Sequence, residues 1–165
     1  GRCQKSRLVS VISNLFMMRK KKHLSKSAAE TIQFGRKLGE TLTPGTVVGL
    51  VGDLGSGKTT MVKGIALGLG VRNKRQVHSP TFVIFHIYKG RIPLYHFDLY
   101  RLEREADLDA VGFDEFLSDP NAVSVIEWAD RIPSVLSRCH KQIDLRLQSE
   151  KERVFWVRDA KRNAT

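Results

Sequence analysis

The sequence predicts an α/β fold in a single domain that runs from about residue 23 to residue 160, and three features indicate it. An apolar, β-branched run at 46–51 is typical of a buried strand. Apolar residues then recur at helical spacing over 58–69. Further β-rich runs follow, separated by turn residues. With 165 residues and 41% apolar content, the chain can bury a core of its own.

The first predicted helix precedes the run at the centre of this pattern. Ser27 and Glu30 have the spacing of a capping box, which is typical of a helix start, and we expect the helix to end near Thr41. Pro44 and Gly45 then turn the chain into the first central strand. The apolar stripe of this helix is expected at Ile32, Phe34 and Leu38.

The helix at 58–69 is predicted to end at Gly68 and Gly70, because glycine is common where a helix stops. The basic segment 72–75 that follows is expected to be a solvated connection. The core-facing residues of the helix are expected to be Met61, Val62, Ile65, Ala66 and Leu69.

Two strand pairs and one buried strand are predicted in the second half of the chain. Lys89 and Gly90 separate the first, hairpin-like pair, and residues 148–151 separate the last pair, an antiparallel hairpin. A polar, helix-like stretch at 103–117, broken at Gly112, precedes the buried strand. The predicted strands cover residues 83–88, 92–97, 122–126, 143–147 and 154–157.

Residues 52–59, between the first central strand and the helix at 58–69, read Gly-Asp-Leu-Gly-Ser-Gly-Lys-Thr. Two glycines separated by four residues and followed by lysine and a hydroxyl residue form the phosphate-binding loop pattern. Glycine lets successive backbone N–H groups curl around anionic oxygens, and the strand–loop–helix order places those oxygens at a helix N-terminus. This stretch therefore predicts a site for a nucleoside triphosphate.

Two side chains of this loop have specific expected roles. Lys58 is expected to reach the β- and γ-phosphates, and the Thr59 hydroxyl is expected to bind Mg²⁺. The residues predicted to contact the nucleotide here are Asp53, Leu54, Gly55, Ser56, Gly57, Lys58, Thr59 and Thr60.

Two carboxylates stand where predicted strands stop. Asp98 follows the run at 92–97 and Glu127 follows the run at 122–126, and ligands of open α/β sheets lie beyond the carboxyl ends of the strands. Glu127 is the better candidate for a second magnesium ligand, because one hydroxyl matches the metal charge poorly. Asp98 is then the candidate for positioning or activating an attacking water, or for a further metal contact. Arg101 could stabilise a transferring phosphoryl group, although such an arginine more often pairs with a carboxylate.

The net charge of +11 suggests an anionic partner, either a nucleic acid or the acidic face of a protein. Residues 1–29 hold eight Lys or Arg residues and no Asp or Glu, so most of the excess lies in the N-terminal part. We therefore expect residues 1–22 to form a flexible basic extension, which either precedes the native start or is a transit peptide. Residues 161–165 are expected to form a C-terminal tail.

The expected compartment is the cytoplasm, with a mitochondrion or plastid as the alternative if the extension is a transit peptide. Cys3 and Cys139 are far apart in the sequence, which indicates a reducing compartment and no disulfide framework. No segment approaches the roughly 18 apolar residues of a membrane span, so we expect no membrane partner.

Four blocks of sequence together resemble the TsaE family, the small ATPases of bacterial tRNA threonylcarbamoyladenosine synthesis. Of these blocks, His-Phe-Asp-Leu-Tyr-Arg and the downstream Ile-Glu-Trp are more specific than the phosphate-binding loop. The resemblance implies a P-loop NTPase fold in which parallel central strands are flanked by antiparallel ones, with helices on both faces. The blocks lie at residues 52–60, 79–82, 96–101 and 126–128.

The resemblance also implies slow, Mg²⁺-dependent hydrolysis of ATP in a complex with the proteins TsaB and TsaD, which resets the complex between turnovers. That complex attaches the threonylcarbamoyl group to N6 of adenosine 37 in tRNA, so tRNA would be an indirect partner. By the match of motifs, Lys58, Asp98 and Glu127 would be catalytic. Thr59 and Glu127 would bind the metal, and Trp128 would lie close to the nucleotide.

Two other functions remain open from the residues alone. A small-molecule kinase uses the same loop but usually needs an arginine-bearing lid, and the basic segment 72–75 follows the loop helix too closely to be identified as one. A non-catalytic module would bind ATP only to fix a conformation for its partners. In the family function, the segments expected to change on hydrolysis are 79–82 and 98–101.

Overall fold

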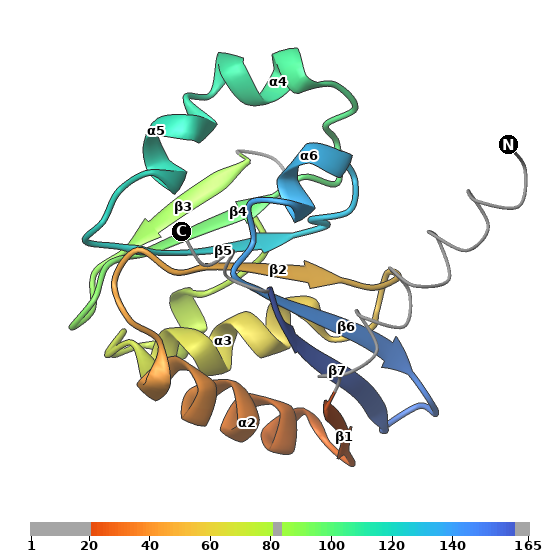
Figure 1. Cartoon of the computed structure of the whole chain (residues 1–165). Helices are drawn as coiled ribbons and strands as arrows, with labels where there is room; N and C mark the ends of the chain where they lie inside the picture. The colour runs from red at the N-terminus through yellow and green to blue at the C-terminus, as the bar shows by residue number, and fades with distance from the viewer. Residues whose placement is uncertain (1–20, 81–83, 161–165) are drawn as a thin grey trace, which may run out of the picture.

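The computed structural model describes residues 21–80 and 84–160, which form one seven-stranded sheet with helices on both faces (Figure 1). The strand order is β1-β7-β6-β2-β5-β4-β3. The strands are β1 (Lys21–Ser25), β2 (Val47–Val51), β3 (Phe85–Tyr88), β4 (Leu94–Asp98), β5 (Val123–Glu127), β6 (Lys141–Leu147) and β7 (Arg153–Asp159). The helices are α2 (Ala28–Thr41), α3 (Lys58–Gly68), α4 (Glu105–Ala110), α5 (Phe113–Leu117), α6 (Pro133–Leu136) and the short 3₁₀ helix η1 (Lys74–Gln76).

The centre of the sheet is parallel. β2 pairs in parallel with β6 on one side and with β5 on the other, and β5 pairs in parallel with β4. β3 and β7 run antiparallel to their inner neighbours, and β1 pairs antiparallel with β7 at the edge. The predicted α/β fold, with parallel central strands between antiparallel ones, is therefore confirmed. This order places the carboxyl ends of β2, β5 and β4 side by side.

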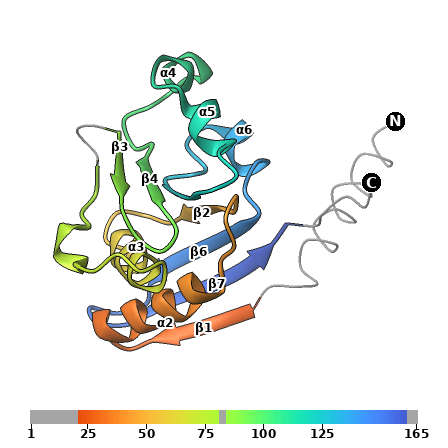
Figure 2. The same ribbon diagram turned by 90° about the vertical axis from the view of Figure 1, so that its left-hand side faces the viewer.

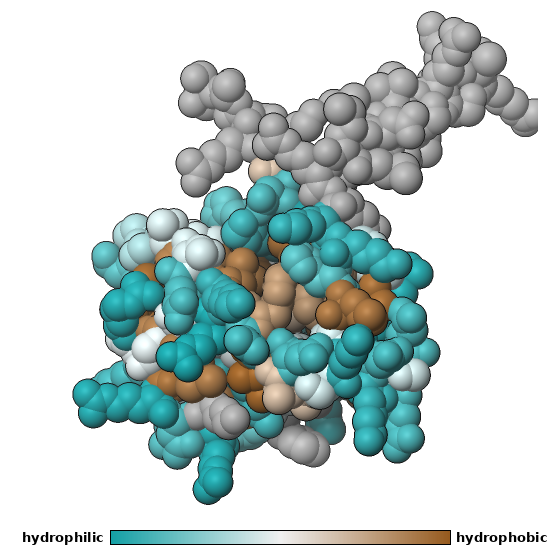
Figure 3. Space-filling model, turned by 90° about the horizontal axis from the view of Figure 1, so that it is seen from below, coloured by the Kyte–Doolittle hydropathy of each residue, from teal (hydrophilic) through white to brown (hydrophobic). Residues whose placement is uncertain are grey.

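The sheet separates two helical layers. α2 and α3 cover one face, whereas α4, α5 and α6 cover the other (Figure 1, Figure 2). β2 is buried on both faces, as expected for a central parallel strand: Val48 and Leu50 share a core with α3, and Val47 belongs to the opposite core. Seen from the side of α2 and α3, hydrophilic side chains surround smaller hydrophobic areas (Figure 3). The five residues predicted to face the core from α3 are all fully buried.

α2 and α3 pack against each other through glycines. A Cβ atom on Gly64 would lie 2.2 Å from the carbonyl oxygen of Ile32, and a Cβ atom on Gly68 would lie 2.2 Å from that of Arg36. The two backbones can approach this closely only because neither glycine carries a side chain. The packing fixes the position of α3, and α3 begins at the phosphate-binding loop.

Of two sequence-based expectations for these helices, the structure corrects one and confirms the other. Phe34 and Leu38, which were expected on the core-facing side of α2, are only partly buried against the core. The fully buried side of α2 includes Gly35 and Gly39. The end of α3 is as predicted: Gly68 is its last residue, and Gly70, with φ +87°, is the left-handed residue just beyond it. Glycine has a packing role here that a stop signal does not require.

Other boundaries are shifted by a few residues. Ser27 caps α2 as predicted, since its side chain accepts a hydrogen bond from Glu30 N. The helix-like stretch at 103–117 is two short helices, because Gly112 adopts φ +70° between them. Lys21 and Lys22, placed in the extension, belong to β1, while the rest of the extension and the tail lie outside the described residues. No helix in the described ranges is long and apolar enough to cross a membrane.

Candidate functional site

The phosphate-binding loop joins the carboxyl end of β2 to the start of α3. Gly55 has φ +78° and Gly57, which precedes the first residue of α3, has φ +99°. Residues with a side chain rarely adopt this backbone conformation, so both positions require glycine. A Cβ atom on Gly52 would lie 2.4 Å from the carbonyl oxygen of Leu145. The loop is therefore shaped by its glycines, as the pattern predicted.

Lys58 folds back over this loop. Its ammonium nitrogen donates hydrogen bonds to the carbonyl oxygens of Gly52 at 2.6 Å and Asp53 at 2.9 Å, and it lies 4.1 Å from the centre of the Trp128 ring. Burial lowers the pKa of Lys58, while the nearby carboxylates, first of all Glu127, oppose this shift. A buried ammonium with these short-range partners is poised to exchange carbonyl oxygens for a more strongly charged acceptor.

Glu127 connects the loop to the interior of the sheet. One carboxylate oxygen accepts the Thr59 hydroxyl at 2.7 Å, and the other lies 2.6 Å from Nε2 of His96. Only 2% of Glu127 is exposed, at the end of β5. The two oxygens are therefore held by residues from α3 and β4, and the carboxylate has a fixed orientation.

Asp98 lies beside Glu127, because the two residues are directly paired where β4 and β5 end. One of its oxygens accepts the backbone N–H of Tyr100 at 2.9 Å, and the other accepts the hydroxyl of Ser79. The residue is almost fully buried, with 3% of its surface exposed. The predicted pair of strand-end acids is thus brought together within one site.

Trp128 and Tyr100 form an aromatic wall next to Lys58. Their ring centres are 4.9 Å apart, and Trp128 has a left-handed backbone with φ +57°. Hydrogen bonds from Leu99 N to Glu127 O and from Ala129 N to Leu50 O hold the chain on both sides of Trp128. Positive φ is uncommon for a residue with a bulky side chain and persists where the surroundings enforce it, often at a functional site.

A hollow of about 300 Å³ adjoins the start of α3. It lies between the N-terminal end of α2 and the turn that joins β6 to β7. The residues that line it include Gly57 from the loop, Thr60 from the first turn of α3 and Arg153 from the first position of β7. The Arg153 side chain passes within 3.8 Å of the place where a Gly57 Cβ would lie. The hollow therefore extends the loop toward α2 and β7.

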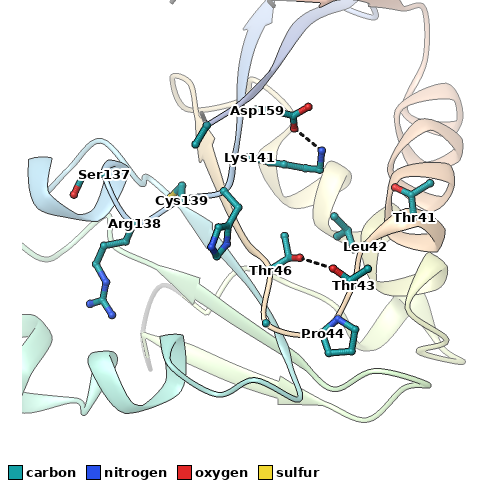
Figure 4. Close-up of a pocket in the computed structure, with 13 residues that line it drawn as sticks. Thr41, Leu42, Thr43, Pro44, Thr46, Ser137, Arg138, Cys139, Lys141 and Asp159 are labelled. Atoms are coloured by element: carbon teal, nitrogen blue, oxygen red, sulfur yellow. Dashed lines mark hydrogen bonds and ion pairs between the residues drawn. The ribbon is translucent and has the colours of Figure 1, made fainter. Parts of the chain in front are cut away.

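A second hollow, of about 450 Å³, lies at the opposite end of the strands (Figure 4). Residues of the α2–β2 connection and the start of β6 line it, among them Thr43, Thr46 and Lys141. Lys141 forms an ion pair with Asp159 at 2.5 Å, and the Thr43 and Thr46 hydroxyls are 3.3 Å apart. Ligands of parallel sheets bind beyond the carboxyl ends of the strands, so this hollow is not the site that the loop defines.

Some of the predicted site residues lie in contact with one another, and others lie at the exposed rim of the site. Lys58, Thr59, Glu127 and Trp128 are joined by direct contacts, and Asp98 is the neighbour of Glu127. Ser56 is buried beneath Lys58, with its hydroxyl 3.4 Å from the ammonium nitrogen. The rim of the loop is exposed at Asp53, Leu54 and Gly55, and Arg101 is exposed in the turn after β4.

Sequence reasoning missed three contributors to this site. His96 could have been found, because it stands two positions before Asp98 in a strand and therefore points to the same face of the sheet. Tyr100 and Arg153 gave no comparable signal, since their places depend on the packing of Trp128 and on the β6–β7 turn. All three are distant from the loop in the sequence.

The chemistry of the site favours a phosphorylated ligand and a hard cation. Backbone N–H groups at the start of α3 and the Lys58 ammonium suit phosphate oxygens. The Thr59 hydroxyl and the Glu127 carboxylate are oxygen donors of the kind that Mg²⁺ takes from a protein, with water and phosphate oxygens completing its shell. These residues therefore fit a magnesium-bound nucleotide.

The sheet and the loop between β2 and α3 together define a P-loop protein. Comparison with known families specifies it further: the model of the family "Threonylcarbamoyl adenosine biosynthesis protein TsaE" matches residues 25–158. The chain belongs to the TsaE family.

Individual relatives agree with this assignment. The chain is 41% identical over 134 residues to the tRNA threonylcarbamoyladenosine biosynthesis protein TsaE of Treponema pallidum, a match that covers 81% of this chain and 97% of that protein. It is 44% identical over 111 residues to the TsaE protein of Bacillus subtilis, with 67% of each chain covered. The crystal structure of YdiB from Bacillus subtilis is similar, with a TM-score of 0.66, 29% identity, and 87% and 88% of the two chains covered.

Proposed function

We propose that this protein is an ATPase required for the threonylcarbamoyladenosine modification of tRNA at adenosine 37, acting with TsaB and TsaD. Its relatives are named for the biosynthesis of this modified nucleoside. One structural observation carries the proposal: Lys58 and the Thr59–Glu127 pair meet where the phosphate-binding loop enters α3. Together they match the γ-phosphate and magnesium end of a bound ATP.

Lys58 binds the β- and γ-phosphates in this proposal. Its present partners are the carbonyl oxygens of Gly52 and Asp53. Phosphate oxygens carry more negative charge than carbonyl oxygens, and a charge-assisted hydrogen bond is stronger than a neutral one. Lys58 therefore exchanges these partners for the phosphates.

Thr59 and Glu127 hold Mg²⁺. When bound, the metal neutralises charge on the phosphates that is otherwise concentrated at the loop. The Thr59 hydroxyl and one Glu127 oxygen lie 2.7 Å apart, so both donors are already directed to one point. Asp98, on the neighbouring strand end, is placed to orient the attacking water and to accept its proton.

The nucleoside end of ATP occupies the hollow between α2 and the β6–β7 turn. This hollow borders Gly57 and Thr60, so it begins where the phosphates end. Arg153 is anchored there by hydrogen bonds to the carbonyl oxygens of Ser149 and Glu152, at 3.3 and 3.2 Å. The anchored side chain forms one wall for the ribose and base.

Hydrolysis regulates the complex through the segments 79–82 and 98–101. The hydroxyl of Ser79 donates to Asp98, so the described start of the first segment is tied to the second; residues 81 and 82 lie outside the described ranges. Contacts to a γ-phosphate can order neighbouring loops and release them after hydrolysis. ATP then favours the state that binds TsaB and TsaD, and ADP favours release.

Two measurements test this function. Phosphate release should be slow with the protein alone and faster when purified TsaB and TsaD are added. Release of ADP that depends on a small-molecule acceptor would instead indicate a kinase, and absence of both would indicate a non-catalytic module. Calorimetric titration of the TsaB–TsaD pair should give about tenfold higher affinity with a non-hydrolysable ATP analogue than with ADP, equivalent to about 1.4 kcal/mol of coupling. Equal affinities with the analogue, with ADP and without nucleotide would contradict nucleotide control.

A further inference from the structure

His96 is fully buried in β4, the strand next to the edge strand β3. Its strand β4 is paired on both sides, with His86 of β3 opposite it on one side and Val125 of β5 on the other. Two residues further along β4, Asp98 pairs with Glu127. The imidazole points to the same face as these acids, because side chains two positions apart share a face of the sheet.

The contact between His96 and Glu127 has a defined direction. Nε2 of His96 lies 2.6 Å from one oxygen of Glu127, and both side chains are almost completely inaccessible. A carboxylate that binds a metal only accepts hydrogen bonds, so in a metal-binding role of Glu127 the Nε2 atom carries the hydrogen and donates it. His96 therefore satisfies the carboxylate oxygen that points away from the phosphate-binding loop.

The other oxygen of Glu127 accepts the Thr59 hydroxyl at 2.7 Å. With each oxygen held by a different partner, the carboxylate cannot rotate without breaking one buried hydrogen bond. A buried acceptor that loses its donor without gaining water in its place is unfavourable. His96 thus fixes which oxygen faces the loop, and it does so from the interior of β4.

We propose that His96 is a positioning residue for Glu127, which keeps one carboxylate oxygen directed at the magnesium position beside Thr59. This role rests on the proposed function, because it concerns the metal that accompanies the nucleotide. Residues that orient metal ligands in this way change metal affinity by about 10–100-fold when removed. His96 itself touches neither the metal nor the nucleotide.

The alternative is that His96 only stabilises the sheet. The effect of Mg²⁺ on nucleotide affinity distinguishes the two roles. The test uses the full chain and a fluorescent ADP analogue, titrated with Mg²⁺ and again with a chelator. His96→Leu should reduce the enhancement of binding by Mg²⁺ about tenfold, while affinity in chelator changes less than twofold. His96→Gln, which can place an N–H near the Nε2 position, should retain most of the enhancement.

Tyr88→Phe provides a matched control. The Tyr88 ring lies 6.3 Å from the His96 ring in the same buried layer, and the substitution removes only a hydroxyl. It should leave the magnesium enhancement unchanged. If His96→Leu does not fold, His96→Asn replaces it, because its shorter side chain places the amide near Nδ1 and not near Nε2. The asparagine variant must then lose the enhancement that the glutamine variant keeps.

Two results would overturn the role of His96. Equal losses in Mg²⁺ and in chelator would show a purely structural residue, and full magnesium enhancement in His96→Leu or His96→Asn would show that Glu127 needs no positioning. A wild-type protein whose nucleotide binding does not respond to Mg²⁺ would contradict the proposed function itself. The wild-type titration therefore distinguishes failure of the site from failure of His96.

Discussion

The two ends of the parallel strands differ in the buried ionisable groups that they contain. At the carboxyl ends, Lys58, His96, Asp98 and Glu127 are each no more than 5% exposed, and each has short-range polar partners. At the amino ends, the buried ionisable group among the described residues that line the hollow is the thiol of Cys139. The lysine and aspartate there, Lys141 and Asp159, form a pair that solvent reaches.

This difference indicates where the fold accepts an energetic cost. Burying charged groups is costly unless they are paired and hydrogen-bonded, and replacing such pairs by apolar residues is often neutral or stabilising. A cluster of them at one end of the sheet is therefore better explained by binding and chemistry than by stability. The amino ends need no such cluster, and their buried ionisable group stays neutral.

The largest expected difference between the two ends concerns Cys139. Burial raises the pKa of its thiol from 9.0 to about 12, and the thiolate is the form that reacts. Three units lower the thiolate fraction at pH 8 about a thousandfold. In a Cys3→Ser variant, iodoacetamide should therefore modify native Cys139 about a thousandfold more slowly than the same protein unfolded in guanidinium. A difference below tenfold would mean that this end of the sheet is open to solvent.

Lys58 gives the next largest effect. Lys58→Ala should weaken ATP binding by more than about a hundredfold, because two charge-assisted hydrogen bonds to phosphate are lost, each worth roughly 1.5–3 kcal/mol. Isothermal titration calorimetry measures the affinity. Lys141→Ala is the matched control at the other end, where the exposed pair with Asp159 contributes at most about 1 kcal/mol to stability. ATP affinity within twofold of wild type in Lys58→Ala would contradict the site assignment.

The site residues that could be predicted from the sequence are those identified by short local patterns. The loop pattern at 52–59 and the apolar spacing of α3 determine the position of Lys58 and Thr59, and the ends of apolar runs identified Asp98 and Glu127. The contact of His96 with Glu127 depends on the register between β4 and β5, which one sequence does not specify. The glycine packing of α2 on α3 was missed because glycine reads as a stop signal when the neighbouring helix is unknown.

Gly68→Ala breaks this packing near the amino ends. Gly68 lies in the last turn of α3, and a Cβ atom there would be 2.2 Å from the Arg36 carbonyl oxygen and 2.7 Å from the Gly39 Cα atom. Backbone atoms cannot move aside like a flexible side chain, so we expect a loss of about 1–3 kcal/mol in the free energy of unfolding. Urea unfolding measures it. The folded variant should bind nucleotide like wild type, since the loop lies at the other end of α3.

A substitution at an exposed position of α2 provides the control for Gly68→Ala. Ala28 lies at the exposed start of α2, and Ala28→Ser should change the free energy of unfolding by about 0.5 kcal/mol or less. If Gly68→Ala is as stable as this control, the two helices are not in the close contact described. If Gly68→Ala keeps its stability but loses nucleotide binding, the amino and carboxyl ends of the strands are coupled and do not act independently.

The smallest expected effect separates the two acids of the site. Glu127→Gln should reduce the enhancement of nucleotide binding by Mg²⁺ about tenfold, because the carboxylate oxygen beside Thr59 loses its charge. Asp98→Asn should leave that enhancement within about twofold, since its oxygens accept hydrogen bonds from Ser79 and from Tyr100 N, whereas Glu127 is the acid that contacts Thr59. Both variants should lose phosphate release, Asp98→Asn because the amide is a poor base. Titrating a fluorescent ADP analogue with and without Mg²⁺, alongside phosphate release, gives both quantities for each variant. A larger magnesium defect in Asp98→Asn than in Glu127→Gln would reverse the two roles, and Asp98 would then be the metal-side acid of this site.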